Sequence, residues 1–268
     1  MRYAYSVAAA IAAGTMVVGA SVASADSGFS YMEPVANGVN LKVLATAGDK
    51  INGYTLFGVP DGMGVLQDGK NATILMNHEL SAGDKVASVA KRANGLATAS
   101  TVSALNFDTA TGTIVGATEL LKNVSWYDYA TGQYGSKPVA PTGAAAKDSY
   151  GVANHNNALN RFCSSSTVQP GGLSYKDASG ITYGYTGPAY LTTEEGSDES
   201  RAFISDTAGN LIQLPRLGLG GKETAVVVPT GNKVTAVMSN EDGAATSDRK
   251  STRLNSSHRA LSRMPSSA

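Results

Sequence analysis

Three stretches of this chain share one pattern, an apolar run that ends in polar and acidic residues. They read ATILMNHE at 72–79, AYLTTEE at 189–195 and VTAVMSNED at 234–242. Taken singly, each is an ordinary strand end, because turns favour Asn, Asp and Gly. Together they indicate one site if the three strands occupy equivalent places in the architecture. The residues concerned are Asn77, His78, Glu79, Glu194, Glu195, Asn240, Glu241 and Asp242.

Metal binding is the chemistry that such a site would support. Carboxylates gathered without a neighbouring Lys or Arg repel one another and raise one another's pKa values, and bound cations relieve that repulsion. Oxygen ligands alone suit calcium, whereas adding His78 or Cys163 admits a transition metal such as iron. We therefore predict calcium, with or without iron, as the cofactor. The predicted ligands are His78, Glu79, Glu194, Glu195, Glu241 and Asp242.

Two further residues could serve this chemistry. Arg201 lies in EEGSDESRAF at 194–203, where it either pairs with acids of a solvated loop or holds a phosphate oxygen by a bidentate contact. We predict the second, catalytic role for Arg201. Cys163 is the single cysteine, which excludes an internal disulfide. It is either a small buried apolar residue or a metal-bound thiolate.

Short β-strands must position these residues. Turn signals separate pairs of apolar runs at 68–69, 109–112, 208–210 and 229–232. Strands rich in Val, Ile, Thr and Tyr with such frequent turns favour an all-β sandwich, barrel or propeller. Two Gly-rich and Pro-containing stretches are expected to be long loops, namely 127–150 and 164–180.

A β-propeller would make the three strand ends equivalent. Its innermost strands, one per blade, all run along the central channel, so polar groups at matching ends converge on the axis. Glu195 and Glu241 are 46 residues apart, close to a blade period of about 40–50 residues. We predict an all-β fold over residues 26–247, an incomplete β-propeller with short antiparallel strands and long loops.

Neither end of the chain is expected to belong to this domain. Residues 1–25 combine Arg2, an apolar run and a small-residue cleavage pattern, which predicts a signal peptide and a secreted or periplasmic protein without a transmembrane segment once the signal is removed. Residues 248–268 back-translate to a sequence that resembles a short-read sequencing adapter. We expect them to be a non-native tail, with the native protein continuing past Ser247.

Charge argues against nucleic acid as a partner. Residues 26–247 hold 15 basic and 20 acidic side chains, a net charge near −5. Nucleic-acid-binding domains are typically basic. An acidic exported protein is better suited to binding cations.

Three ordered motifs give the chain a resemblance to a known family. PDGMGVLQDGKNATILMNHEL at 60–80, YLTTEEGSDESRAF at 190–203 and VTAVMSNEDG at 234–243 resemble the secreted PhoX-type alkaline phosphatases and their uncharacterised propeller relatives. The resemblance implies a β-propeller with a calcium- and iron-containing centre that hydrolyses phosphomonoesters. It matches Glu194 and Glu195 to the family's Glu-Glu motif and residues 77–79 to its Asn-His-Glu strand end. The family's cysteine lies shortly before the Glu-Glu pair, whereas Cys163 lies 31 residues before Glu194.

Two functions follow. The first is a fragment of an exported metal-dependent phosphatase that acts on a small phosphorylated substrate. The second is a non-catalytic, calcium-stabilised exported propeller that acts as a binding or surface protein, because folds often outlive one activity.

Overall fold

The structure is a computed structural model, and it describes residues 30, 32–81, 100–137, 159–196, 200–228 and 230–241. The predicted signal peptide at 1–25 and the predicted tail at 248–268 lie outside these residues. Within the described part of the chain the regular structure consists of β-strands and one 3₁₀ turn, η1 (Pro215–Leu217). No helix there has the length and apolarity needed to cross a membrane.

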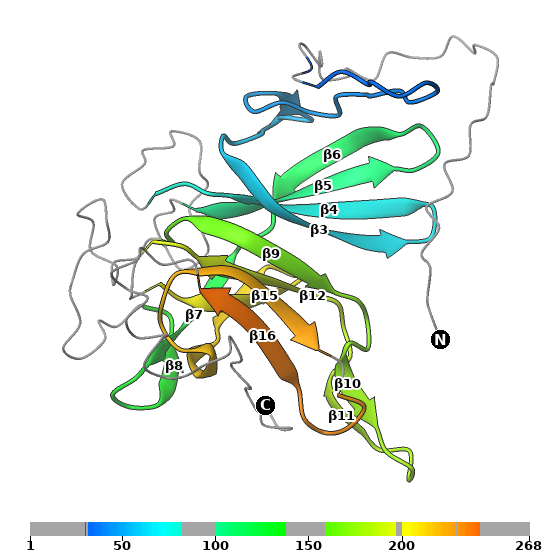
Figure 1. The fold of residues 1–268 in the computed structure, drawn as a ribbon. Coiled ribbons are helices and arrows are strands. Elements are labelled where there is room, and N and C mark those ends of the chain that lie inside the picture. Colours follow the sequence, from blue (N-terminus) through cyan, green and yellow to red (C-terminus); the bar gives the residue numbers. More distant parts are fainter. Residues whose placement is uncertain are drawn as a thin grey trace.

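Two sheets and a hairpin form the body of the molecule (Figure 1). Sheet 1 is an antiparallel meander of β3 (Pro60–Asp68), β4 (Asn71–His78), β5 (Thr101–Asp108) and β6 (Thr113–Glu119). Sheet 2 has the order β8 (Gln133–Gly135), β7 (Asn123–Asp128), β14 (Asn210–Gln213), β13 (Ala202–Asp206), β12 (Ala189–Glu194) and β9 (Phe162–Val168). The third unit, hairpin 3, pairs β15 (Lys222–Val228) with β16 (Ala236–Glu241).

Two short ladders complete the topology. They are β1 (Lys50–Ile51) with β2 (Tyr54–Thr55), and β10 (Leu173–Lys176) with β11 (Thr182–Tyr185). Among the described strands, every pair is antiparallel except β14 with β7, which is parallel. The expected all-β class is therefore confirmed. The described sheets are open rather than closed into a barrel, an arrangement consistent with an incomplete propeller.

The sequence predicted the hairpins better than the loops. All four turn signals connect consecutive antiparallel strands, namely β3–β4, β5–β6, β13–β14 and β15–β16. The expectation of a loop throughout 164–180 was wrong, since β9 extends to Val168 and β10 begins at Leu173. Likewise β8 lies inside 127–150. Ser165 and Ser166 are residues that turns favour, but pairing with β12 fixes them in a strand.

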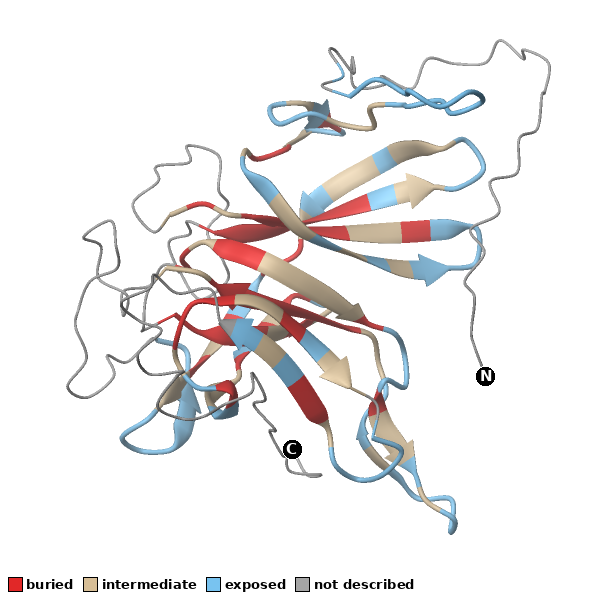
Figure 2. Ribbon diagram, in the orientation of Figure 1, coloured by how far each residue is buried: buried red, intermediate tan, exposed pale blue. Residues whose placement is uncertain are grey.

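We call β3, β9 and β15 the leading strands of sheet 1, sheet 2 and hairpin 3, and β9 contacts both of the others. Strand β9 contacts β3 of sheet 1 on one side and β15 of hairpin 3 on the other. The three acid-ended strands β4, β12 and β16 are the antiparallel partners of these leading strands. They therefore share one place in their units, that of the strand paired with the leading strand. Buried residues concentrate where the ends of β4 and β5 meet β9 and β12 (Figure 2).

Glycines allow β3 to approach β9 closely. A Cβ at Gly62 would lie 2.5 Å from the carbonyl oxygen of Cys163 and 2.5 Å from the amide nitrogen of Ser165. A Cβ at Gly64 would lie 2.4 Å from the methyl group of Thr167. The backbone contact between the two sheets thus depends on the absence of side chains in the DGMG segment.

Asn77 ties the two sheets together at the same place. Its Nδ2 donates to the carbonyl oxygens of Cys163 (2.9 Å) and Ser164 (3.1 Å), and its Oδ1 accepts from the Tyr190 hydroxyl (2.9 Å). Thr192 Oγ1 lies 2.9 Å from the same amide. Because Asn77 is completely buried, removing this amide would leave several polar groups without partners, which is costly.

We expect Gly62→Ala to destabilise the protein by about 2–3 kcal/mol, because the added methyl group meets backbone atoms that cannot rotate away. Gly58→Ala is the matched control, since nothing lies within 4 Å of its added Cβ. Urea unfolding of both variants measures the difference. Equal stability of the two variants would contradict the close packing of β3 on β9.

Candidate functional site

The strand pairs β3–β4, β9–β12 and β15–β16, which we call the three hairpins, share one irregularity at the same end. In each, the first residue of the leading strand pairs with the last residue of the returning strand, and the register then shifts. The pairs are Pro60↔His78, Phe162↔Glu194 and Lys222↔Glu241. β-Bulges of this kind reorient side chains and are frequent beside functional sites.

The second residues of the leading strands lie within these bulges and carry the chemistry. They are Asp61, Cys163 and Glu223. The Cys163 sulfur lies 3.7 Å from Glu223 Oε2, and Asp61 also faces the thiol. Ligand atoms of Cys163, Glu195 and Glu223 all lie within 4.8 Å of one another. We call Asp61, Cys163, Glu195 and Glu223 the acidic centre.

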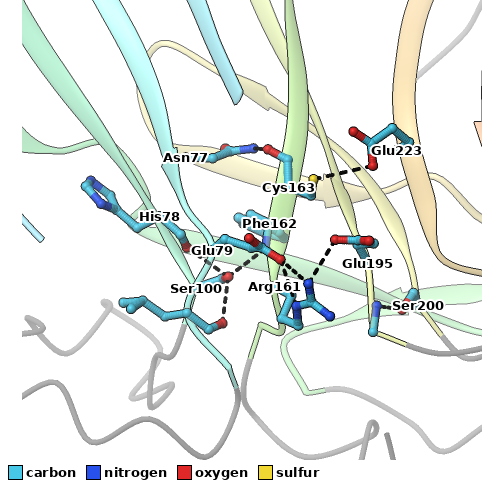
Figure 3. A network of polar contacts seen from close by, with 12 residues as sticks. Asn77, His78, Glu79, Ser100, Arg161, Phe162, Cys163, Glu195, Ser200 and Glu223 are labelled. Atoms are coloured by element: carbon cyan, nitrogen blue, oxygen red, sulfur yellow. Dashed lines mark hydrogen bonds and ion pairs between the residues drawn. The ribbon is translucent and has the colours of Figure 1, made fainter. Parts of the chain in front are cut away.

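Arg161 connects the acidic centre to Glu79, as Figure 3 shows. Its Nε donates to Glu79 Oε1 at 2.7 Å, and its Nη2 contacts both Glu79 Oε1 and Glu195 Oε2, the latter at 3.1 Å. The structure therefore brings Glu79 and Glu195 together, as the sequence suggested. A basic side chain accompanies them, because Arg161 supplies a positive charge between the two carboxylates.

Glu194 and Arg201 form a separate, buried pair. Arg201 donates to the Glu194 carboxylate through Nε and Nη2, both at 2.6 Å, and through its backbone amide. Asn160 contributes another backbone N–H at 2.9 Å. The guanidinium also lies over Trp126, with its Cζ 4.5 Å from the ring centroid. Glu194 and Arg201 were predicted as a metal ligand and a phosphate clamp, but here the two groups are engaged with each other.

The imidazole of His78 points away from the acidic centre (Figure 3). Side chains alternate along a strand, so Asn77 faces β9 while His78 lies on the opposite face. Its Nδ1 lies 3.0 Å from the Gly58 carbonyl oxygen, and its Nε2 lies 2.6 Å from Ser103 Oγ. Both ring nitrogens are thus occupied by protein groups, which leaves His78 outside the set of gathered ligands.

The third acid-ended strand is only partly defined. The backbone of Glu241 pairs with Lys222, the residue before Glu223, so this strand end lies beside the acidic centre. Asp242, the other predicted ligand on this strand, lies outside the described residues. In the sequence, Asp242 follows Glu241 as Glu79 follows His78 and Glu195 follows Glu194.

Electrostatics keep the thiol of Cys163 protonated when no cation is bound. Burial raises its pKa, and the neighbouring Asp61, Glu195 and Glu223 raise it further, because a thiolate beside three carboxylates is unfavourable. The same donors suit a cation. Carboxylates alone match calcium, and including the sulfur matches a thiophilic metal such as iron. The residues present therefore fit either of the metals expected from the sequence.

Sequence reasoning missed three members of this network, Asp61, Arg161 and Glu223. Each lies at or just before the start of a leading strand, within PDGMG, NRFC or KETAV. A search for acids at the start of the strand that precedes each acid-ended strand would have found Asp61 and Glu223. Arg161 offers no such signal, since only the pairing of β9 with β12 brings it beside Glu195.

No protein-family model, curated protein or solved structure matches this chain.

We expect acid to destabilise the protein through His78. Desolvation lowers the pKa of the buried imidazole below its ordinary value of 6.5, so the unfolded chain binds a proton more readily than the folded one. The stabilisation is complete above the unfolded-state pKa and is lost as the pH falls towards the folded-state pKa. Urea unfolding at several pH values between neutral and mildly acidic measures how the free energy of unfolding changes with pH. His78→Gln should make the free energy of unfolding depend less on pH. An unchanged pH dependence in this variant would contradict the role of His78.

Arg161→Met tests the internal counter-charge. Without the guanidinium, Glu79 and Glu195 repel each other, so we expect a loss of about 1–2 kcal/mol of stability that excess calcium chloride restores. The affinity for calcium should increase, because the variant removes a positive charge that adjoins the acidic centre. Lys42→Met, which changes a lysine bound to the Gly112 carbonyl oxygen, is the control. Thermal melts with and without calcium measure the loss of stability and its recovery. A melting temperature of Arg161→Met that does not change with calcium would contradict the prediction.

Proposed function

We propose that the chain is part of an exported, metal-dependent phosphatase-like propeller that hydrolyses phosphomonoesters. One observation carries this proposal: three equivalent bulged hairpins direct Asp61, Cys163 and Glu223 to one place, where Glu195 joins them. Repeating units that each contribute a metal-binding side chain at the same position indicate a centre on a shared axis. The resemblance of the acid-ended motifs to PhoX-type phosphatases supports the reaction class.

The acidic centre would hold the metal. Cys163, Glu195 and Glu223 offer ligand atoms within 4.8 Å of one another, with Asp61 beside the thiol. When bound, calcium or iron would polarise a phosphoryl oxygen and offset the negative charge of the phosphate. The role of the protein is to fix the carboxylates on rigid strands, so that little reorganisation accompanies binding.

Arg161 is better suited than Arg201 to contact a phosphate. Only 7% of the Arg201 side chain is exposed, and releasing it would leave the carboxylate of Glu194 buried without its charge partner. The Arg161 side chain is 24% exposed and already adjoins the acidic centre. A guanidinium there can exchange a carboxylate for a phosphate by a bidentate contact. We therefore assign the phosphate-binding role predicted for Arg201 to Arg161.

The test is hydrolysis of p-nitrophenyl phosphate by the full chain with added calcium and iron. Cys163→Ser and Glu223→Gln should each lower metal content and reduce the rate by roughly 10–100-fold. Glu33→Gln, at an exposed position in the N-terminal segment, is the matched control. Elemental analysis of the purified proteins accompanies the assay. A chain that retains metal stoichiometrically but releases no p-nitrophenol would refute the phosphatase.

The second candidate is a calcium-stabilised exported propeller without catalysis, which serves as a binding or surface protein. It is favoured by the way the chain neutralises its own acids, Glu194 with Arg201 and Glu79 and Glu195 with Arg161. Ion pairs of this kind hold the side chains in place without a catalytic metal. This candidate predicts that calcium raises the melting temperature while no phosphomonoester is hydrolysed, whereas stoichiometric iron in the purified protein would count against it.

A further inference from the structure

A cavity lies apart from the bulged ends of the hairpins. It has a volume of about 560 Å³ and is lined by residues of the β10–β11 hairpin, of strands β13 and β14, and of the turn that joins β15 to β16. Cavities of this size commonly hold small organic ligands. No residue of the acidic centre lines it, so its role is independent of the proposed function.

Part of the cavity lining belongs to the hydrophobic core. Leu173 and Ala189 belong to its lining and also to the buried cluster formed with Val168, Leu191 and Val237. The remaining apolar lining is more open, since Ile212 is 40% exposed and Val234 is 37% exposed. A buried floor with exposed apolar walls is the usual form of a site that desolvates a ligand.

Three tyrosines, Tyr175, Tyr183 and Tyr185, form the hairpin side of the cavity. Gly184 separates two of them, with a φ of +87° and a Cβ position only 2.3 Å from the Leu173 carbonyl oxygen. Glycine is therefore required between these tyrosines, because a side chain would break the hairpin that presents them. Aromatic rings of this kind provide a large apolar surface at low cost in conformational entropy.

The polar groups of the lining are mostly used by the protein itself. The Asp206 carboxylate accepts from the backbone and side-chain amides of Asn210. Asn232 Oδ1 accepts from the Val234 amide, and its Nδ2 donates to the Thr230 carbonyl oxygen. These groups are committed to turns, so the lining lacks the free planar amides and carboxylates that a sugar-binding site needs to bind hydroxyl groups.

Lys233 is the charged group that remains to face a ligand. Its Nζ lies 3.7 Å from the ring centroid of Tyr183. The contact with Tyr183 raises the pKa of Lys233, so the ammonium stays charged across the physiological range. A cation above an aromatic wall, beside aliphatic side chains, is complementary to a molecule with an apolar body and one negative group.

We propose that this cavity binds a small amphipathic carboxylate, with its apolar body against the tyrosines and Ile212 and its carboxylate on Lys233. The binding is non-covalent.

The test uses 4-phenylbutyrate and its uncharged analogue 4-phenylbutan-1-ol in ligand-observed NMR titrations of the full chain. Phenylbutyrate should bind more tightly than the alcohol. Lys233→Met should weaken the binding of phenylbutyrate by about 3-fold, the scale of an exposed ion pair, and leave the binding of the alcohol unchanged. Lys70→Met, in the turn of the β3–β4 hairpin, is the matched control and should alter neither. Ile212→Ser should weaken both probes.

Three results would overturn the proposal. Absence of binding by both probes would remove the site. Equal binding of acid and alcohol, unaffected by Lys233→Met, would remove the anionic component. Binding of maltose without binding of phenylbutyrate would assign the tyrosines to a sugar instead. Circular dichroism of each variant separates loss of the fold from loss of the cavity.

Discussion

Negative charge crowded at one end of three hairpins is the constraint on which this structure depends. Asp61, Glu79, Glu195 and Glu223 lie in one region there, and like charges placed so near one another repel. Arg161 compensates for two of them with hydrogen-bonded ion pairs. Asp61 and Glu223 lie beside the thiol of Cys163, where their negative charges raise its pKa.

The two sheets are also joined at this end of the molecule. Asn77 reaches from β4 to the backbone of β9 and to Tyr190 and Thr192 of β12, so the network crosses both sheets. Gly62 lets the backbone of β3 pass close to β9. The bulges and this packing together fix the acidic side chains before any ligand arrives. Preorganisation of this kind favours binding because little ordering remains to be done.

Two kinds of acidic residue are thus distinguished by their surroundings. Glu194 receives four hydrogen bonds and is almost completely buried, which makes its carboxylate part of the framework. Glu195, the next residue, points to the other face of the strand and joins the acidic centre. The two glutamates therefore have different roles: Glu194 holds Arg201 over Trp126, and Glu195 pairs with Arg161 at the acidic centre. The alternation of a β-strand is sufficient to separate them.

Local patterns in the sequence determined the class of fold, the four hairpin turns and the fact that three strands end in acid. Turn residues and short apolar runs act over a few positions, so they can be recognised without knowing what the strands pack against. Tertiary structure alone decided which acids meet. The bulges that turn Asp61, Cys163 and Glu223 to one place, the burial of Glu194 on Arg201, and the position of Arg161 between Glu79 and Glu195 all depend on the register between strands. Residues as much as 115 positions apart, such as Asn77 and Thr192, set that register, and no local pattern records it.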